Sequence, residues 1–118
     1  MHTLRTALLT TALGLAIAAC SGSASSQSHH VDSAEAHRLV EQGATLLDVR
    51  TEGEFAGGHL PGAVLVPVAE LASRMSEVPR DRPVVVYCRS GARSASAAST
   101  LRALGFAKVA DLGPMSAW

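Results

Sequence analysis

Cys88 lies between an apolar segment and a short loop that carries two arginines. Residues 84–93 read VVVYCRSGAR, so the cysteine follows a predicted strand, and a predicted helix follows the loop. A helix N-terminus offers unpaired N–H groups and a partial positive charge, and Arg89 and Arg93 add two guanidinium groups. Such surroundings lower the pKa of a thiol and favour the nucleophilic thiolate. The sequence therefore indicates a cysteine nucleophile that acts on anions.

The loop after the cysteine supplies the candidate residues for binding an anionic substrate, which are Arg89, Ser90, Gly91, Ala92 and Arg93. Arg93 can bind the oxygens of an anion through its planar guanidinium, while Arg89 either assists or faces solvent. Gly91 permits a tight turn. Ser90 and Ser94 can donate hydrogen bonds, or Ser94 simply caps the helix.

Residues 1–19 resemble a bacterial lipoprotein signal peptide. Arg5 provides a positively charged start, residues 7–15 form an apolar core, and small residues precede Cys20. The stretch 17–20, IAAC, resembles a lipobox, which implies that Cys20 is lipidated and becomes the mature N-terminus. Residues 20–30 are rich in serine, and we expect the lipidated cysteine and a flexible tether there.

The lipobox resemblance implies a protein of the bacterial cell envelope that is anchored in a membrane through Cys20 and faces the periplasm. Ser21 after the cysteine favours the outer over the inner membrane. Two alternatives remain open, an ordinary signal peptide cleaved near Ala19 and a transmembrane anchor. The apolar run 7–19 disfavours the anchor, because a spanning helix requires about 20 residues.

Residues 31–118 are enough for one small domain. Acidic and basic residues balance over the chain, so no basic surface suggests nucleic acid as a partner. With Cys20 lipidated, Cys88 has no disulfide partner in the chain, and its neighbours favour a reactive thiol over an inert, buried one. His29 and His30 lack nearby cysteine or carboxylate ligands, so we expect no metal and no other cofactor. We expect a monomer.

Strand and helix signals alternate along this domain. Helices are predicted over residues 32–42, 68–75 and 94–104, with a short helical turn over 52–56. Strands are predicted over residues 45–49, 63–66, 84–87 and 107–112, of which 84–87 is rich in β-branched residues and suits a buried, central position. This alternation predicts an α/β fold, with a small, open, mostly parallel sheet and helices on both faces.

Three segments of residues 31–118 resemble the rhodanese family. Residues 46–63 (LLDVRTEGEFAGGHLPGA) resemble its N-terminal signature, residues 84–94 (VVVYCRSGARS) its active-site loop, and residues 113–118 (GPMSAW) its closing motif. Three motifs in the right order make the resemblance specific. Pro114 departs from the family pattern, in which glycine is more usual, and we expect altered backbone geometry there.

The resemblance implies a single-domain sulfurtransferase of the thiosulfate type, in which Cys88 is the nucleophile and carries sulfur as a persulfide. A small anionic donor would load the sulfur, and a thiol or cyanide would accept it. Residues 89–93 would form the cradle around the sulfur. Asp48 and Arg50 match the LDVR element and His59 the GH element, and we expect these three to support the loop. We expect Glu52 and Glu54 to face solvent.

Two other functions stay open. A non-catalytic persulfide carrier or redox-sensing module, tethered to the membrane, would use the same residues. Cysteine phosphatases and arsenate reductases form the second class, because cysteine phosphatases also hold a thiolate in a cradle of N–H groups with an arginine. Their signature places five residues between the two, whereas four residues separate Cys88 from Arg93. The shorter loop suits a sulfur atom better than a phosphoryl group.

Overall fold

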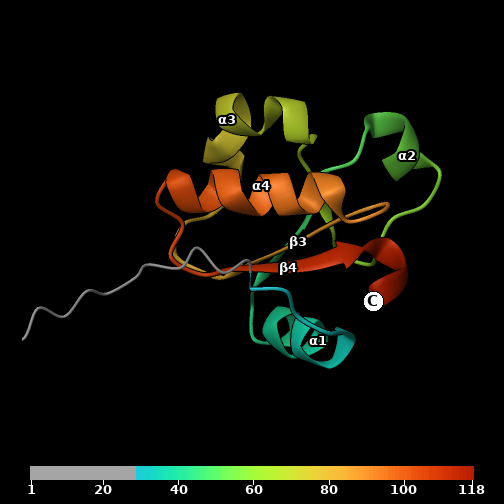
Figure 1. Ribbon diagram of the computed structural model, residues 1–118, viewed down its shortest axis with the longest axis horizontal. Helices are drawn as coiled ribbons and strands as arrows, with labels where there is room; N and C mark the ends of the chain where they lie inside the picture. Colours follow the sequence, from blue (N-terminus) through green and yellow to red (C-terminus); the bar gives the residue numbers. More distant parts are fainter. Residues whose placement is uncertain (1–28) are drawn as a thin grey trace, which may run out of the picture.

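The computed structural model describes residues 29–118, so the predicted signal peptide, the predicted lipidation site at Cys20 and most of the predicted tether lie outside the described residues. Within the described part, four strands form an open sheet in the order β2–β1–β3–β4, and every pair of neighbours is parallel. The strands are β1 (Thr45–Asp48), β2 (Val64–Leu65), β3 (Val84–Cys88) and β4 (Val109–Pro114). The predicted open α/β sheet is confirmed (Figure 1).

Helices cover both faces of the sheet, as predicted. Helix α1 (Ser33–Glu41) lies on one face, and α3 (Leu71–Arg74) and α4 (Ala92–Ala103) lie on the other (Figure 1). Helix α2 (Glu52–Ala56) follows β1. The predicted helix over 68–75 is a short α-helical turn between two 3-10 turns, Val68–Glu70 and Met75–Glu77, and a third 3-10 turn, Met115–Ala117, follows β4. In residues 29–118, no helix is both long and apolar enough to cross a bilayer.

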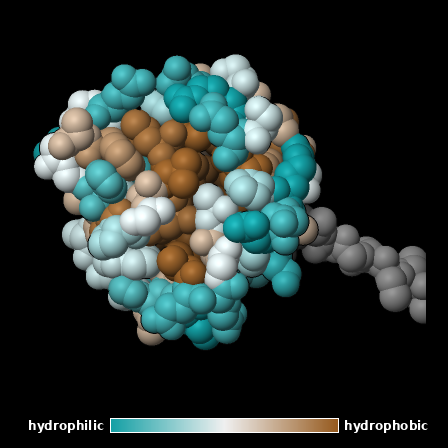
Figure 2. All heavy atoms as spheres, turned by 180° about the vertical axis from the view of Figure 1, so that it is seen from behind, coloured by the Kyte–Doolittle hydropathy of each residue, from teal (hydrophilic) through white to brown (hydrophobic). Residues whose placement is uncertain are grey.

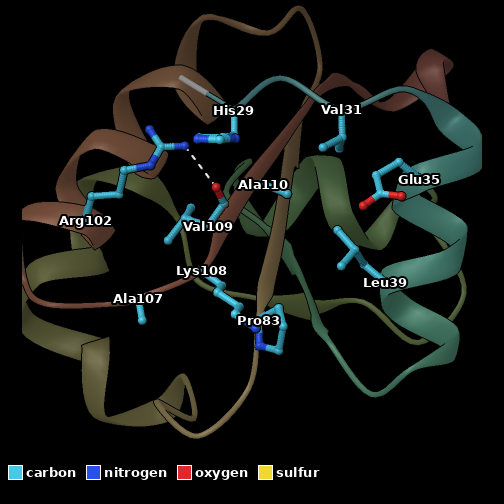
Figure 3. Close-up of a pocket in the computed structure, with 10 residues that line it drawn as sticks. All are labelled: His29, Val31, Glu35, Leu39, Pro83, Arg102, Ala107, Lys108, Val109 and Ala110. Atoms are coloured by element: carbon cyan, nitrogen blue, oxygen red, sulfur yellow. Dashed lines mark hydrogen bonds between the residues drawn. The ribbon is translucent and has the colours of Figure 1, made fainter. Parts of the chain in front are cut away.

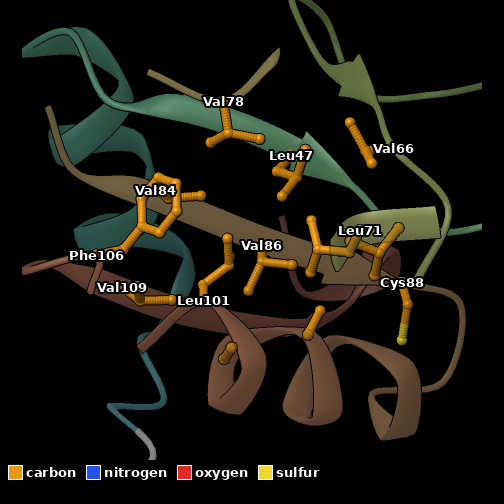
Figure 4. Close-up of a cluster of buried hydrophobic side chains, with 13 residues drawn as sticks. Leu47, Val66, Leu71, Val78, Val84, Val86, Cys88, Leu101, Phe106 and Val109 are labelled. Carbon is orange, nitrogen blue, oxygen red and sulfur yellow. The ribbon is translucent and has the colours of Figure 1, made fainter. Parts of the chain in front are cut away.

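Side chains of β3 alternate between the two faces of the sheet. Val84, Val86 and Cys88 belong to the apolar cluster on the side of α3 and α4 (Figure 4), whereas Val85 and Tyr87 belong to the cluster on the side of α1. All five residues are 0% exposed. A strand that is buried on both faces requires a continuous apolar run, which explains the run of valines.

The two edges of the sheet differ. Strand β2 contributes two paired residues, and its Val64 is 43% exposed. At the other edge, His29 and His30, which were assigned to the tether, run along β4, since the His29 carbonyl accepts a hydrogen bond from the Asp111 N–H at 2.9 Å. Seen from behind the view of Figure 1, hydrophobic side chains gather in the middle of the molecule and hydrophilic ones surround them (Figure 2).

A buried ion pair at the carboxyl end of β1 is linked to the end of β3 through Tyr87. Asp48 is 0% and Arg50 5% exposed, and Oδ2 of Asp48 accepts hydrogen bonds from Nη2 of Arg50 (2.7 Å) and from the Tyr87 hydroxyl (2.6 Å). The same hydroxyl accepts a hydrogen bond from the Leu60 N–H at 3.1 Å, and Nη2 of Arg50 donates to the Gly58 carbonyl at 2.7 Å. The network therefore fixes the loop after β1 against the end of β3.

Replacement of Asp48 by alanine is expected to lower the free energy of unfolding by about 3–5 kcal/mol, because it leaves a guanidinium buried without its counter-charge. Tyr87→Phe is expected to cost about 1–3 kcal/mol, because it leaves the Leu60 N–H unpaired. Urea unfolding measures both values. Glu77→Gln, which removes an exposed ion pair, is the control and should change little. A loss for Asp48→Ala no larger than that of the control would contradict the role of the network.

Candidate active site

The sulfur of Cys88 lies at the N-terminus of α4. The Gly91 N–H donates a hydrogen bond to Sγ of Cys88 at 3.0 Å, and α4 begins at the next residue, Ala92. The first N–H groups of a helix have no partner inside the helix. The sulfur therefore occupies the place that a capping side chain usually fills. Figure 4 shows the Cys88 side chain at the end of the apolar cluster, with its sulfur directed toward α4.

Helix α4 begins two residues before its predicted start at Ser94. Its N-cap is Gly91, which has a φ of 103° in the left-handed region that favours glycine. Gly91 offers no side chain to the helix, so the N–H groups of the first turn are left for the sulfur. Ser94 is not the cap, because its hydroxyl donates to the Gly91 carbonyl at 3.0 Å from within the first turn.

The pKa of the Cys88 thiol lies below its ordinary value. Burial has the largest single effect and raises the pKa, because it disfavours the charged form. The polar groups around the sulfur, which are the Ser94 hydroxyl and the N–H groups of Ser94, Gly91 and Ser90, lower the pKa and together outweigh burial; among them the Gly91 N–H donates a hydrogen bond to Sγ in this structure. A hydroxyl has one proton, so Ser94 must turn away from the Gly91 carbonyl to donate it to the sulfur.

Arg93 is paired with a carboxylate from another helix. Its Nη1 and Nη2 donate to Oε1 and Oε2 of Glu54 at 2.7 and 3.0 Å, which is the strong bidentate geometry. The prediction that Glu54 faces solvent is wrong, since its side chain is 26% exposed and points to Arg93. The hydrogen bonds from Arg93 are the largest cause that lowers the pKa of Glu54 to about 2. Sequence reasoning missed Glu54 because its partner is 39 residues away along the chain.

The charge of Cys88 also affects the pKa of Arg93. The hydrogen bonds to Glu54 are the main cause that raises the pKa of Arg93, and the negative charge of Cys88 raises it further. The guanidinium and the cysteine are therefore electrostatically coupled, and the binding of an anion by Arg93 stays a prediction. Its two terminal nitrogens are already engaged by Glu54, which the sequence does not reveal.

The remaining loop residues are open to solvent. Arg89, Ser90 and Ala92 are exposed, and within residues 29–118 Arg89 forms no ion pair. His59 is an exposed turn residue whose Nδ1 lies 3.0 Å from the Phe55 carbonyl oxygen and whose ring stacks on Phe55 with the centroids 3.7 Å apart. This geometry suits a supporting role rather than acid–base chemistry.

Asp48 and Arg50 support the site from the other face of the sheet, with Tyr87 as their partner. Burial is the largest cause that raises the pKa of Tyr87 to about 12, and its hydrogen bond to Asp48 adds to the effect. The hydroxyl therefore keeps its proton near neutral pH and remains a donor. These residues hold the backbone near Cys88 and do not contact the sulfur through any hydrogen bond in the described part of the chain.

Pro114 packs beside the active-site loop. It lies opposite Cys88 in the pairing of β3 with β4, and its φ of −71° is an ordinary value for proline. A Cβ placed on Gly91 would lie 3.7 Å from Cδ of Pro114. The pairing of β4 shifts by one residue just before this point, since Val86 faces Asp111 and Tyr87 faces Gly113.

A groove of about 390 Å³ lies at the opposite end of the sheet (Figure 3). Its lining includes Pro83, Lys108 and Val109, which lie where β3 and β4 begin, whereas Cys88 is the last residue of β3. The groove is therefore separate from the cysteine site. Within residues 29–118, no group of three or more histidine, cysteine and acidic side chains could hold a metal ion.

Comparison with known proteins agrees with this geometry. The chain is 47% identical over 74 residues to a sulfurtransferase of Allochromatium vinosum, a match that covers 62% of this chain and 69% of that protein. It is 38% identical over 84 residues to the thiosulfate sulfurtransferase GlpE of Pseudomonas fluorescens, which covers 70% and 77%. The human single-domain sulfurtransferase TSTD1 has a TM-score of 0.63 and 30% identity, and the match covers 76% of this chain and 91% of that one.

The family assignment rests on nearly all of the described residues. Residues 32–118 match the rhodanese-like domain family, and this range contains the whole sheet, the loop after Cys88 and the Glu54–Arg93 pair. The chain belongs to the family of rhodanese-like domains.

Proposed function

We propose that this protein is a sulfurtransferase that moves sulfane sulfur from thiosulfate, or a similar donor, through a persulfide on Cys88 to a thiophilic acceptor. The hydrogen bond from the Gly91 N–H to Sγ of Cys88 at 3.0 Å carries the proposal, because N–H groups at the start of a helix stabilise an anion. The activities in the names of the Allochromatium and Pseudomonas relatives support it.

The first step loads the cysteine. The Cys88 thiolate attacks the outer sulfur of thiosulfate, and a new sulfur–sulfur bond forms while the bond to the sulfonate sulfur breaks. Sulfite leaves with the electron pair of that bond, and Cys88 becomes a persulfide anion. No proton is transferred, so a thiolate that already exists before the donor arrives is the main requirement.

The second step unloads the cysteine. Cyanide or an acceptor thiolate attacks the terminal sulfur of the persulfide, and Cys88 leaves as a thiolate, which completes the cycle. The products are thiocyanate or a persulfide of the acceptor. Negative charge remains next to the loop in every state, and the N–H groups at the start of α4 stabilise it without a metal.

We also propose that the protein is anchored in the bacterial envelope through a lipid on Cys20, with the domain on the periplasmic side. The sequence IAAC at 17–20 supports this proposal. A Cys88 without a disulfide partner fits it as well, because the only other cysteine would carry the lipid.

The purified protein is expected to release thiocyanate from thiosulfate and cyanide, read by the colour of the iron complex. Cys88→Ser is expected to abolish the release, because the alcohol cannot carry the sulfur. Added mass of one sulfur on Cys88 without turnover would instead support a persulfide carrier. Hydrolysis of a chromogenic phosphate ester, without thiocyanate, would contradict the proposed function.

Ser94→Ala is expected to raise the pKa of the Cys88 thiol, because it removes one donor to the thiolate. Alkylation by iodoacetamide at neutral pH should slow roughly three- to tenfold, since one hydrogen bond corresponds to about one pKa unit. The midpoint of the rate–pH profile should move upward. Ser96→Ala, an exposed serine of the same helix, is the control. Identical midpoints for the two variants would exclude the Ser94 hydroxyl as a donor.

Cells grown with a labelled fatty acid are expected to label the protein, and Cys20→Ala should lose the label. Fractionation of the membranes then shows which membrane holds it. Cys88→Ser is the matched cysteine variant and should keep the label. Label that survives in Cys20→Ala would refute lipidation at this position.

A further inference from the structure

We propose that Glu54 is a specificity-determining residue of the Cys88 site, whose carboxylate compensates the charge of Arg93 and so weakens the attraction of the site for doubly charged sulfur donors. This inference rests on the proposed function. Glu54 acts through Arg93 and does not touch the sulfur, so it is a positioning residue and not a catalytic one.

The ion pair lies at the surface of the site while the sulfur is enclosed. Arg93 is 33% and Glu54 26% exposed, whereas Cys88 is 0% exposed. An anion that approaches Cys88 meets a guanidinium whose two terminal nitrogens already donate to a carboxylate at 2.7 and 3.0 Å. The attraction that an unpaired guanidinium would exert is therefore largely cancelled at this point.

Local structure holds the carboxylate in place. Thr51 caps α2, and its Oγ1 accepts a hydrogen bond from the Glu54 N–H and donates one to Oε1 of Glu54, both at 3.2 Å. The Thr51 backbone N–H also donates to Oε1 of Glu54 at 3.5 Å, which completes a capping box and fixes the side chain at the third position of the helix. Because the pKa of Glu54 is about 2, the carboxylate is charged near neutral pH.

The net charge of the ionised side chains around Cys88 favours sulfur donors with a low negative charge. Arg50 is paired with Asp48, and Arg93 is paired with Glu54. Among residues 29–118, Arg89 is a cation of this loop without an ion-pair partner. Its single positive charge is balanced by the single negative charge of the Cys88 thiolate. Thiosulfate carries two negative charges and gains little from this arrangement, whereas a persulfide donor with a single negative charge meets less repulsion from the thiolate.

The test compares Glu54→Gln with the matched control Glu52→Gln in the purified protein. Glutamine also serves in capping boxes, so Glu54→Gln removes the charge and keeps the helix start. Glu52 is an exposed residue of the same helix, and its charge acts on Arg74. The probes are iodoacetate, which is an anion, and iodoacetamide, which is neutral, and both alkylate Cys88.

The ratio of the iodoacetate rate to the iodoacetamide rate is expected to rise roughly three- to tenfold in Glu54→Gln, since one nearby negative charge is removed, and to stay unchanged in Glu52→Gln. The rise should shrink in high salt, because the pair is partly exposed. An unchanged ratio in Glu54→Gln would overturn the proposal. A fall would overturn it too, because it would mean that Glu54 aims Arg93 at anions instead of compensating it.

Arg93→Gln identifies the route of the effect. Glu54 occupies the two terminal nitrogens of Arg93 that would otherwise be free to donate to an anion, so Glu54→Gln should raise the ratio less in the Arg93→Gln background than in the wild-type background. A rise of the same size in both backgrounds would show that the carboxylate acts only by repelling the reagent directly, which would refute the role of Arg93.

The thiosulfate assay separates this inference from the proposed function. Glu54→Gln is expected to lower KM for thiosulfate more than it changes kcat. Alkylation requires no sulfur transfer, so a protein without thiocyanate release would refute the proposed function while the alkylation ratio still decides the role of Glu54. Thiocyanate release with an unchanged KM and ratio would refute the inference alone.

Discussion

The contact between the Cys88 sulfur and the first turn of α4 is the constraint on which the rest of the site depends. Alternation along β3 sends Cys88 to the face that α4 covers, and a shift of one residue would send it to the face of α1. Gly91 then reverses the chain so that its own N–H reaches the sulfur. The register of β3 thus decides whether the Cys88 thiol meets the N–H groups of α4. The short turn from Cys88 to Gly91 then brings the sulfur within hydrogen-bond distance of the Gly91 N–H.

Two ion pairs flank this contact and differ in what they do. The pair of Asp48 with Arg50 is buried on the face of α1, where it binds β1 to the end of β3 through Tyr87. This pair holds the backbone of β1 and β3 next to the active-site loop. Breaking it is costly, because it leaves an uncompensated buried charge. The pair of Glu54 with Arg93 is partly exposed, contributes less to stability, and instead sets the charge that an arriving anion meets.

Much of the fold could be predicted because its signals are local. Asp32 caps α1, the β-branched run marks β3, and the helical turn over 52–56 forms as α2. The sequence predicts the start of α4 at Ser94, two residues too late, because serine is a common cap and nothing local shows that a cysteine sulfur takes that role. The prediction for Glu54 is wrong for a similar reason. A capping box leaves the second oxygen of a glutamate free, and only the three-dimensional structure shows that the carboxylate of Glu54 pairs with Arg93 of α4.

The complete enclosure of Cys88 has a kinetic consequence. A side chain with no accessible surface reacts only during moments when its surroundings part. In the proposed sulfur transfer, the rate of loading should then approach a ceiling at high donor concentration, where the frequency of opening and not the collision rate is limiting. The same enclosure would lengthen the lifetime of a persulfide on Cys88, because reductants in solution reach the sulfur only when the surrounding residues separate. In the proposed cycle, turnover and protection of the sulfur therefore depend on the same enclosure of Cys88.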